Sequence, residues 1–357
     1  MMQVRNFIIF ICLSQCIIYG ASAQADNASL QKSKSYAKRG KLHYDAGRYD
    51  SAILYFSAAV KLNPKDVNAY FYRGNSREQM GKYDEAITDF TEAIKLDPKD
   101  AGTYCNRGIA KTELKQYNEA IADFNAAIKI DPKFANAYFY RGNAHDELKK
   151  YTEALTDYDM AIKLAPKNAG AYNHRGVTKV NLKRFEDAVA DYNEAITLDP
   201  RSARAYDNRG AAKSELKQYN EALKDFDMSI KLDPKNAKAY DNRGRAKDDL
   251  KKYKEAIEDY SAALKLDPQN ANALNNRGYS KTQLKQYKEA LKDFEHSIDL
   301  DATNPIPFNN IGYAYYKLGN CKKALENFDK ATAMGGKDYT PHFLYREEAA
   351  KQCKGKK

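Results

Sequence analysis

The sequence predicts an all-α protein built as a solenoid of tandem helix pairs. Two periodic series of residues indicate this fold class, because a fixed period of about 20–50 residues is typical of repeat architectures. Glycines recur every 34 residues along most of the chain, and prolines recur with the same period. The glycine series is Gly40, Gly74, Gly108, Gly142, Gly176, Gly210, Gly244, Gly278 and Gly312. The proline series is Pro64, Pro98, Pro132, Pro166, Pro200, Pro234 and Pro268.

Composition fits a folded chain and leaves the meaning of its charge open. Of 357 residues, 30% are charged and 12% aromatic, and the net charge is +11. A basic balance suggests nucleic acid or anionic surfaces as partners, depending on where the lysines lie. Most of the 28 tyrosines recur at fixed distances from the repeat glycines, so we expect them to be repeat core.

Residues 1–23 are predicted to be a secretory signal. Arg5 supplies a positive start, residues 7–18 are mostly apolar, and Ala21-Ser22-Ala23 offers small residues for cleavage near Ala23. This pattern predicts an exported protein, periplasmic or secreted. Nucleic acid is disfavoured as a partner for the same reason.

Two alternatives to a secretory signal cleaved near Ala23 remain. The apolar stretch could be retained as an anchor, although it is short for a membrane span. A lipid-anchored form at Cys16 is disfavoured, because the residue before it is Gln15 and apolar residues continue after it. Residues 24–32 follow as a polar linker.

Each repeat carries two amphipathic helix patterns. In residues 101–133 the first helix places Tyr104 and Gly108 on one stripe. The second helix places Ala120, Phe124 and Ala127 at i, i+4 and i+7. One helix pair cannot bury both of its faces, so neighbouring pairs are expected to stack.

The repeats are predicted to fill residues 33–334. Proline ends each second helix, because it disfavours helix at the preceding residue. The expected repeats are 33–66, 67–100, 101–134, 135–168, 169–202, 203–236, 237–270, 271–304 and 305–334. Asn304-Pro305 starts the last one as N-cap and first turn. Residues 335–357 are expected to form a capping helix, about Thr340 to Cys353, and a basic tail.

The spacing of aromatic, glycine, tyrosine, alanine, aromatic, alanine and proline over 34 residues resembles the tetratricopeptide repeat. The resemblance implies a right-handed superhelical α-solenoid that acts as a protein-binding scaffold, without catalysis and without cofactors. The sequence departs from the family pattern in three ways. Tyrosine replaces the usual tryptophan, lysine replaces the usual glycine at the turn inside the middle repeats, and arginine replaces the usual leucine before the repeat glycine.

The arginine departure is matched by a second one. Arginine precedes the glycine from Arg39 to Arg277, and from the second repeat to the eighth an aspartate stands 16 residues later. The ninth repeat has Ile311 and Asn327 at these positions and loses both. Because the positions face each other in an antiparallel helix pair, we predict a structural ion pair such as Arg107 with Asp123. A row of arginines that captures anions is the alternative.

The cysteines allow one cross-link in the mature chain. Cys321 begins a second helix and Cys353 closes the predicted capping helix, so a disulfide between them is predicted, with two free thiols as the alternative. Cys105 is expected on the side of its helix away from the core stripe. The five histidines are dispersed and form no metal-ligand spacing with cysteine or carboxylate.

Binding residues are expected on the remaining stripe of each first helix. In proteins that resemble this one, that stripe lines a concave groove that holds peptides or helices. Asparagine recurs there, and its amide offers both a donor and an acceptor to a peptide backbone. The candidate groove residues are Asn75, Asn106, Asn143, Asn208, Asn242, Asn276, Asn310, Tyr279 and Tyr313.

Two points qualify this interpretation of the recurring asparagines. The asparagines could instead only cap or solvate their helices. Tyr72, Tyr140 and His174 interrupt the series two residues before the glycine, so a bound segment should favour the C-terminal half.

Lysines concentrate at the edges of the repeats. One set falls at the turn inside each middle repeat, and another follows the repeat prolines. The turn set is Lys115, Lys149, Lys183, Lys217, Lys251 and Lys285. The favoured function is an exported scaffold that binds a peptide or helix in its groove. The alternative is an envelope-associated protein that binds anionic glycan or a membrane surface through these edges.

Overall fold

The computed structural model describes residues 27–335 and 343–354, and all of their regular structure is α-helical. The chain divides into two compact units, Met1–Lys167 and Asn168–Lys357, where the sequence predicts one uninterrupted array. The predicted signal segment, residues 1–23, lies outside the described part. The same is true of residues 336–342, which include Thr340, the expected start of the capping segment.

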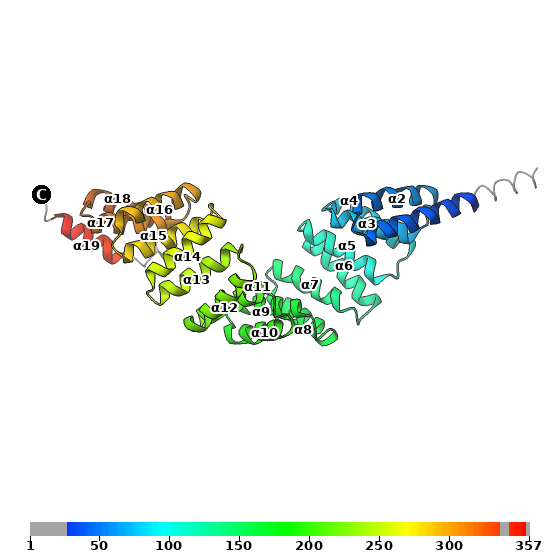
Figure 1. The fold of residues 1–357 in the computed structure, drawn as a ribbon, viewed down its shortest axis with the longest axis horizontal. Helices are drawn as coiled ribbons and strands as arrows, with labels where there is room; N and C mark the ends of the chain where they lie inside the picture. Colours follow the sequence, from blue (N-terminus) through cyan, green and yellow to red (C-terminus); the bar gives the residue numbers. More distant parts are fainter. Residues whose placement is uncertain (1–26, 336–342, 355–357) are drawn as a thin grey trace, which may run out of the picture. The chain divides into compact units, whose positions relative to one another are not determined.

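Successive helices form antiparallel hairpins in both units (Figure 1). Residues 27–45 form the helix that precedes the first labelled one. The other helices of the first unit are α2 (Tyr49–Leu62), α3 (Val67–Gln79), α4 (Tyr83–Leu96), α5 (Ala101–Glu113), α6 (Tyr117–Ile130), α7 (Ala135–Glu147) and α8 (Tyr151–Leu164).

The second unit continues the same alternation. Its helices are α9 (Ala169–Asn181), α10 (Phe185–Leu198), α11 (Ala203–Glu215), α12 (Tyr219–Leu232), α13 (Ala237–Asp249), α14 (Tyr253–Leu266), α15 (Ala271–Gln283), α16 (Tyr287–Leu300), α17 (Pro305–Lys317), α18 (Cys321–Gly335) and α19 (Phe343–Lys354).

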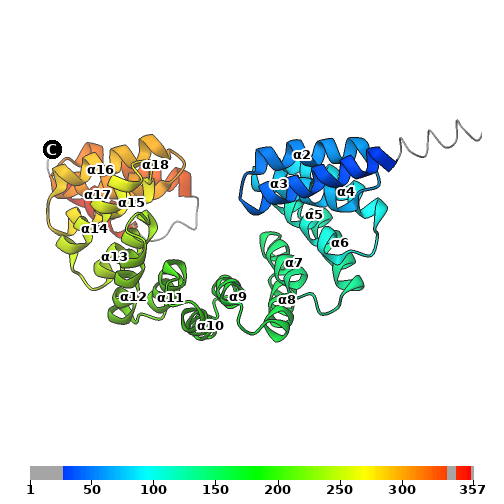
Figure 2. The same ribbon diagram turned by 45° about the vertical axis from the view of Figure 1, so that its right-hand side comes forward.

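The first helices of neighbouring repeats contact each other directly. In the second unit α9 contacts α11, α11 contacts α13, α13 contacts α15, and α15 contacts α17 (Figure 2). In the first unit α3 contacts α5, and α5 contacts α7. The first helices of a unit therefore line one continuous surface, which we call its first-helix face.

Side chains fix where most first helices begin. The Asp100 carboxylate accepts hydrogen bonds from the backbone N–H groups of Gly102 and Thr103, at 3.0 and 3.2 Å. Asn304 caps α17 by accepting from the N–H of Ile306 at 3.0 Å, with Pro305 in the first turn, as predicted. These caps satisfy backbone donors that have no partner within the helix.

The repeat glycines let the two helices of a hairpin meet. A Cβ on Gly108 would lie 2.6 Å from Cε1 of Phe124, and one on Gly278 would lie 2.6 Å from Cε1 of Phe294. Both distances are shorter than any real contact, so only glycine leaves room for the ring. The aromatic residue is fully buried there, as phenylalanine or as tyrosine.

The turn lysines adopt a backbone conformation that favours glycine. The φ angles of the six turn lysines, from Lys115 to Lys285, lie between 58° and 63°. Gly47, Gly81 and Gly319 hold the same turn in the other repeats, with φ between 69° and 76°. A side chain in this left-handed region costs about 1 kcal/mol. A cation at the C-terminal end of a helix offsets part of that cost through the helix dipole.

The last helix covers the end of the array, as predicted. Ala349 of α19 is fully buried against Ala324 and Phe328 of α18. Arg346 Nη2 lies 2.7 Å from Asp329 Oδ1. A terminal helix of this kind closes an apolar surface that a further repeat would otherwise cover.

Two cysteines have described side chains, Cys105 and Cys321. Cys321 is disulfide-bonded, whereas the side chain of Cys353 lies outside the described residues, so its identity as the partner stays a prediction. Cys105 was expected away from the core, which is wrong: it is 1% exposed and packs with Phe124 and Ala144. The first helix of the next repeat, which contains Ala144, covers this side of α5.

Candidate protein-binding face

The predicted ion pair is present from the second repeat to the eighth. Arg107 Nη2 lies 2.6 Å from Asp123 Oδ1, and Nε donates to Oδ2 at 2.9 Å, a bidentate geometry. The seven pairs are Arg73–Asp89, Arg107–Asp123, Arg141–Asp157, Arg175–Asp191, Arg209–Asp225, Arg243–Asp259 and Arg277–Asp293. All seven aspartates are buried. We call this set the seam.

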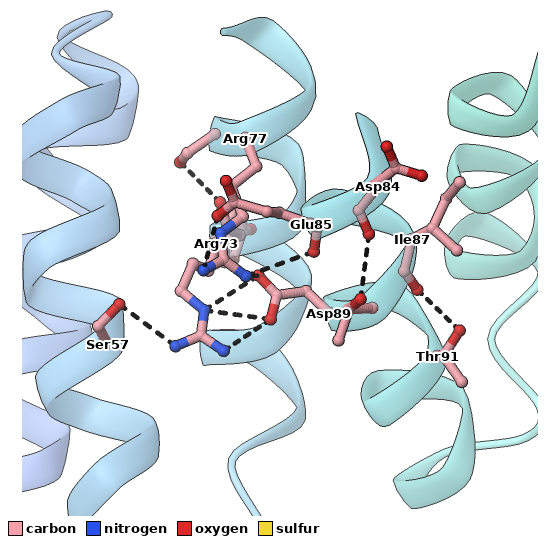
Figure 3. A network of polar contacts seen from close by, with 11 residues as sticks. Ser57, Arg73, Arg77, Asp84, Glu85, Ile87, Asp89 and Thr91 are labelled. Atoms are coloured by element: carbon pink, nitrogen blue, oxygen red, sulfur yellow. Dashed lines mark hydrogen bonds and ion pairs between the residues drawn. The ribbon is translucent and has the colours of Figure 1, made fainter. Parts of the chain in front are cut away.

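The seam contains more contacts than the predicted arginine–aspartate pairs (Figure 3). Asp89 also accepts from Arg77 Nη1 at 2.7 Å, and Arg73 Nη1 donates to Ser57 of the preceding repeat at 3.2 Å. The Arg73 guanidinium lies over the ring of Tyr70, 5.4 Å from its centroid. The guanidinium of Arg73 is therefore already occupied by an aspartate, a serine and an aromatic ring. This arrangement argues against a row of arginines that captures anions.

A signal for the second seam cation was present in the sequence and was missed. A basic residue stands four positions after each seam arginine, one helical turn along the same face. These residues are Arg77, Lys111, His145, Lys179, Lys213, Lys247 and Lys281. Each carboxylate of the seam therefore meets two basic side chains.

The predicted asparagines of the second unit are tied across neighbouring first helices. Each donates its amide N–H to a side chain 35 residues earlier in the chain. The bonds are Asn208 to Asn173 at 3.1 Å, Asn242 to Asp207 at 2.9 Å, Asn276 to Asp241 at 3.5 Å and Asn310 to Asn275 at 2.9 Å. These asparagines thus do more than cap or solvate their own helices.

Of the predicted asparagines of the first unit, Asn106 is tied like those of the second unit, whereas Asn75 and Asn143 act as acceptors. Asn106 donates to Asn75 at 2.8 Å, and Asn75 is only 9% exposed. The Asn143 oxygen accepts from the hydroxyl of Tyr158 at 2.8 Å. The acceptor oxygens of Asn75 and Asn143 are therefore engaged within the unit and are less suited to a partner's backbone.

Three aspartates of the second unit's first-helix face differ from those of the seam. Asp248 accepts from Ser280 at 2.7 Å and from the Tyr260 hydroxyl at 2.9 Å, both neutral donors. Burial raises the pKa of Asp248 to about 6, despite these hydrogen bonds. Burial also raises the pKa values of Asp207 and Asp241, which Asn242 and Asn276 bind with their amides.

The first unit has a comparable group on its own first-helix face. Burial, together with the nearby Glu113 carboxylate, raises the pKa of Glu78 to about 7. Burial and Glu78 raise the pKa of the Cys105 thiol to about 12. At neutral pH the thiol is protonated and a poor nucleophile, so it does not suggest catalysis.

Two cavities open on the first-helix face of the second unit. One, of about 290 Å³, is lined by residues that include Tyr279, Tyr313 and Tyr345. The other, of about 210 Å³, lies between α11 and α13 and is lined by residues that include Glu215 and Asp249. Tyr279 is 42% exposed, and the ring of Tyr313 lies 4.6 Å from that of Tyr345, centroid to centroid.

Two other features are absent from residues 27–335 and 343–354. No cluster of three or more histidine, cysteine, aspartate or glutamate side chains has a geometry that could hold a metal ion. None of the helices described there is both long and apolar enough to span a membrane.

Sequence models of the tetratricopeptide repeat match residues 37–101, 90–122, 135–168, 203–236 and 307–334. Models described as the TPR repeat match residues 110–149, 178–217, 249–283 and 278–319. The chain belongs to the tetratricopeptide repeat family. The fold of this family implies a scaffold for protein–protein interaction. No enzyme family is among these matches, and no curated protein matches the chain.

Two solved structures with TM-scores above 0.5 agree on the fold. A chain of the APC/C hetero-tetramer Cut9–Hcn1 is 17% identical with a TM-score of 0.59, covering 77% of this chain and 54% of that one. This chain thus spans about half the length of that relative. A tetratricopeptide repeat protein from Parabacteroides merdae is 20% identical with a TM-score of 0.56, covering 70% and 99%. YrrB, described as a TPR protein with an unusual peptide-binding site, is 25% identical with a TM-score of 0.45, covering 52% and 95%.

Proposed function

We propose that the protein is a non-catalytic scaffold that holds an extended segment of a partner protein along the first-helix face of its second unit. The amides of Asn208, Asn242, Asn276 and Asn310 carry this proposal. Each is oriented by the hydrogen bond that it donates to the neighbouring first helix. Among the described atoms, its carbonyl oxygen and second N–H have no hydrogen-bond partner.

Such amides suit a peptide backbone. An amide with a fixed orientation can accept from a backbone N–H and donate to a backbone C=O, whatever the partner's side chains. Fixing the amide in advance also lowers the entropy lost when the partner binds. The first unit supports the proposal less well, because the oxygens of Asn75 and Asn143 are already bonded within it.

Export completes this proposal. Residues 1–23 would direct the chain out of the cytoplasm and be removed near Ala23, so that the scaffold acts in the periplasm or outside the cell. Detecting the mature N-terminus by mass spectrometry of the protein from its native host tests this part separately from binding.

Affinity capture with residues 24–357, followed by mass spectrometry, identifies the partner, and three alanine substitutions then locate its site. The changes Asn242→Ala, Asn276→Ala and Asn310→Ala should weaken binding of the captured partner at least about tenfold, measured by titration calorimetry. The matched control is Lys224→Ala, Glu258→Ala and Lys292→Ala, at exposed positions on second helices of adjacent repeats. Unchanged binding by the asparagine variant would remove the first-helix face as the site.

A second candidate function is favoured by the turn lysines. All six are exposed, and they hold a left-handed conformation where glycine serves in the other repeats. Keeping lysine at a position that favours glycine suggests a use for its charge. In this alternative the lysine edges bind an anionic glycan or membrane surface.

Salt separates the two candidates. Binding through exposed lysines should be lost between about 50 and 300 mM salt, because the Debye length falls with ionic strength. Binding through oriented amides should persist there. Replacing Lys183, Lys217, Lys251 and Lys285 by glutamine gives the matching variant, which should abolish binding only in the second case.

A further inference from the structure

We propose that the partner segment held by the second unit carries a lysine or arginine and, about five or six residues away, an aromatic residue. The basic side chain would fill the cavity between α11 and α13, and the aromatic ring would fill the cavity among α15, α17 and α19. This inference rests on the proposed function, because it names the chemistry of the partner on the same face.

The cavity between α11 and α13 suits a side chain with an apolar stem and a cationic head. Ala211, Ala246 and Phe226 line it with apolar surface, and Glu215 and Asp249 line it with carboxylates. Lysine and arginine bury their methylene stems along such surface while the charged head remains with polar groups. A cavity of about 210 Å³ is large enough for one such side chain.

An unsatisfied hydroxyl gives independent support for a ligand here. Ser214 lines the same cavity, and its Oγ is out of contact with solvent without a hydrogen-bond partner among the described atoms. A buried polar atom without a partner costs about 1–3 kcal/mol. Rotation of the Ser214 side chain to another rotamer would bring this oxygen to the cavity, where a bound guanidinium or ammonium group would donate to it.

The charges around the cavity favour a cation. Glu215 and Asp249, the two carboxylates that line the cavity, form no ion pair with any basic side chain among the described residues, in contrast to every seam aspartate. Arg245 and Lys217 also line the cavity. The charge of Arg245 is opposed by the nearby Asp241, whose pKa it lowers against the effect of burial. A basic partner side chain could thus form the ion pair that neither Glu215 nor Asp249 makes within the described residues.

The second cavity suits an aromatic ring. Tyr279, Tyr313 and Tyr345 line it together with Phe294, and the side chains of Thr282 and Asn309 add polar edges. No carboxylate lines this cavity. Aromatic rings prefer tilted or offset contacts with other rings, and Tyr313 and Tyr345 already meet in that way.

Helix packing sets the distance between the two side chains. Packed helices lie about 8–10 Å apart, and the two cavities are separated by two steps along the row of first helices. The separation is therefore about 16–20 Å, which an extended chain covers in about five or six residues at ~3.3 Å per residue. The amides of Asn242, Asn276 and Asn310 lie along this interval.

A phage-displayed library of random dodecapeptides, selected on the purified protein, tests the proposal. We expect enriched peptides to contain lysine or arginine five or six positions from phenylalanine, tyrosine or tryptophan. The Kd of a synthetic enriched peptide, from fluorescence anisotropy, should rise about tenfold in the double variant Glu215→Gln, Asp249→Asn. It should rise similarly in Tyr279→Ala. The matched control, Glu221→Gln with Glu255→Gln, removes the same charge from exposed sites on α12 and α14 and should leave the Kd unchanged.

Each other outcome overturns a defined claim. Enriched peptides without a basic residue, or with no preferred spacing, would overturn this inference. If the asparagine triple variant failed to bind those peptides, the proposed function would still stand. Peptides that bind equally well to the asparagine triple variant, or a selection with no enrichment, would overturn both proposals.

Discussion

Asp259 and Asp248 belong to the same repeat and have opposite surroundings. Asp259 lies in the seam, 2.5 Å from Arg243 Nη2 and 2.8 Å from Lys247 Nζ. Asp248 lies on the first-helix face, with only the hydroxyls of Tyr260 and Ser280 as donors. Burial alone therefore does not determine the role of a carboxylate, which also depends on the basic side chains around it. Asp259 contributes to the fold through two ion pairs, whereas burial favours the neutral form of Asp248, which has none among the described residues.

The largest effect should follow from breaking the seam side of this comparison. Asp259→Asn removes the counter-charge of Lys247 and part of that of Arg243, so it should cost about 3–5 kcal/mol of unfolding free energy. Urea denaturation followed by circular dichroism measures the loss. Glu258→Gln, at an exposed position on the same helix, is the control. Equal losses in both variants would remove the distinction.

A double-mutant cycle tests whether the seam pair acts as a unit. Arg107→Leu alone should destabilise by about 3 kcal/mol, because it leaves the buried Asp123 with only Lys111. Adding Asp123→Leu should recover at least about half of that loss. If the two single effects simply add, the pair does not interact in the folded chain.

For Asp248, on the first-helix face, we expect the opposite effect on stability: removing its charge should stabilise the fold. Burial raises the pKa of Asp248 to about 6 from 3.8, so the folded chain binds more protons than the unfolded chain between about pH 4 and pH 6. Stability from this group therefore falls as the pH rises through that window. Asp248→Asn should raise the Tm by about 2–4 °C at pH 7.5.

The same variant provides its own control at low pH. Near pH 4 the carboxyl of the native chain is protonated and resembles the amide, so the two melting temperatures should converge. A Tm difference that stays constant from pH 4 to pH 7.5 would show that charge is not the cause.

The smallest effect concerns the reach of the seam into the preceding repeat. Arg277 Nη1 donates to Ser261 Oγ at 3.2 Å, so Ser261→Ala should cost about 0.5–1.5 kcal/mol. Ser35→Ala, at an exposed position, should change the stability by less. A loss as large as that of Asp259→Asn would mean that contacts between repeats dominate the seam.

The sequence was sufficient for the fold and for half of the seam. The 34-residue period fixed which positions face each other, so Arg107 and Asp123 could be paired from their spacing alone. The second cation, Lys111, was missed although it stands one turn after Arg107 on the same helix. A buried carboxylate has two oxygens that need donors, so a second basic residue within reach was to be expected.

The contacts of the first-helix face were harder to predict because they join different repeats. Cys105 was misplaced because a single helix pattern does not show which side the next repeat covers. Asp248 meets Ser280, 32 residues later, and neither residue recurs at its position in every repeat. Such contacts depend on how neighbouring hairpins stack, which periodicity within one repeat does not encode.

The seam arginines also bear on how the array folds. Arg73 is bonded at once to its own repeat and to Ser57 in the repeat before it, and Arg107 reaches Thr91 in the same way. In a repeat that folded alone, that guanidinium donor would bond to water instead of to the preceding repeat, so each repeat gains stability from an already folded neighbour. Unfolding should therefore start at the terminal repeats and proceed inward one repeat at a time. In the first repeat, Tyr55 replaces the aspartate that would pair with Arg39. No seam ion pair of this kind is therefore lost when the first repeat unfolds.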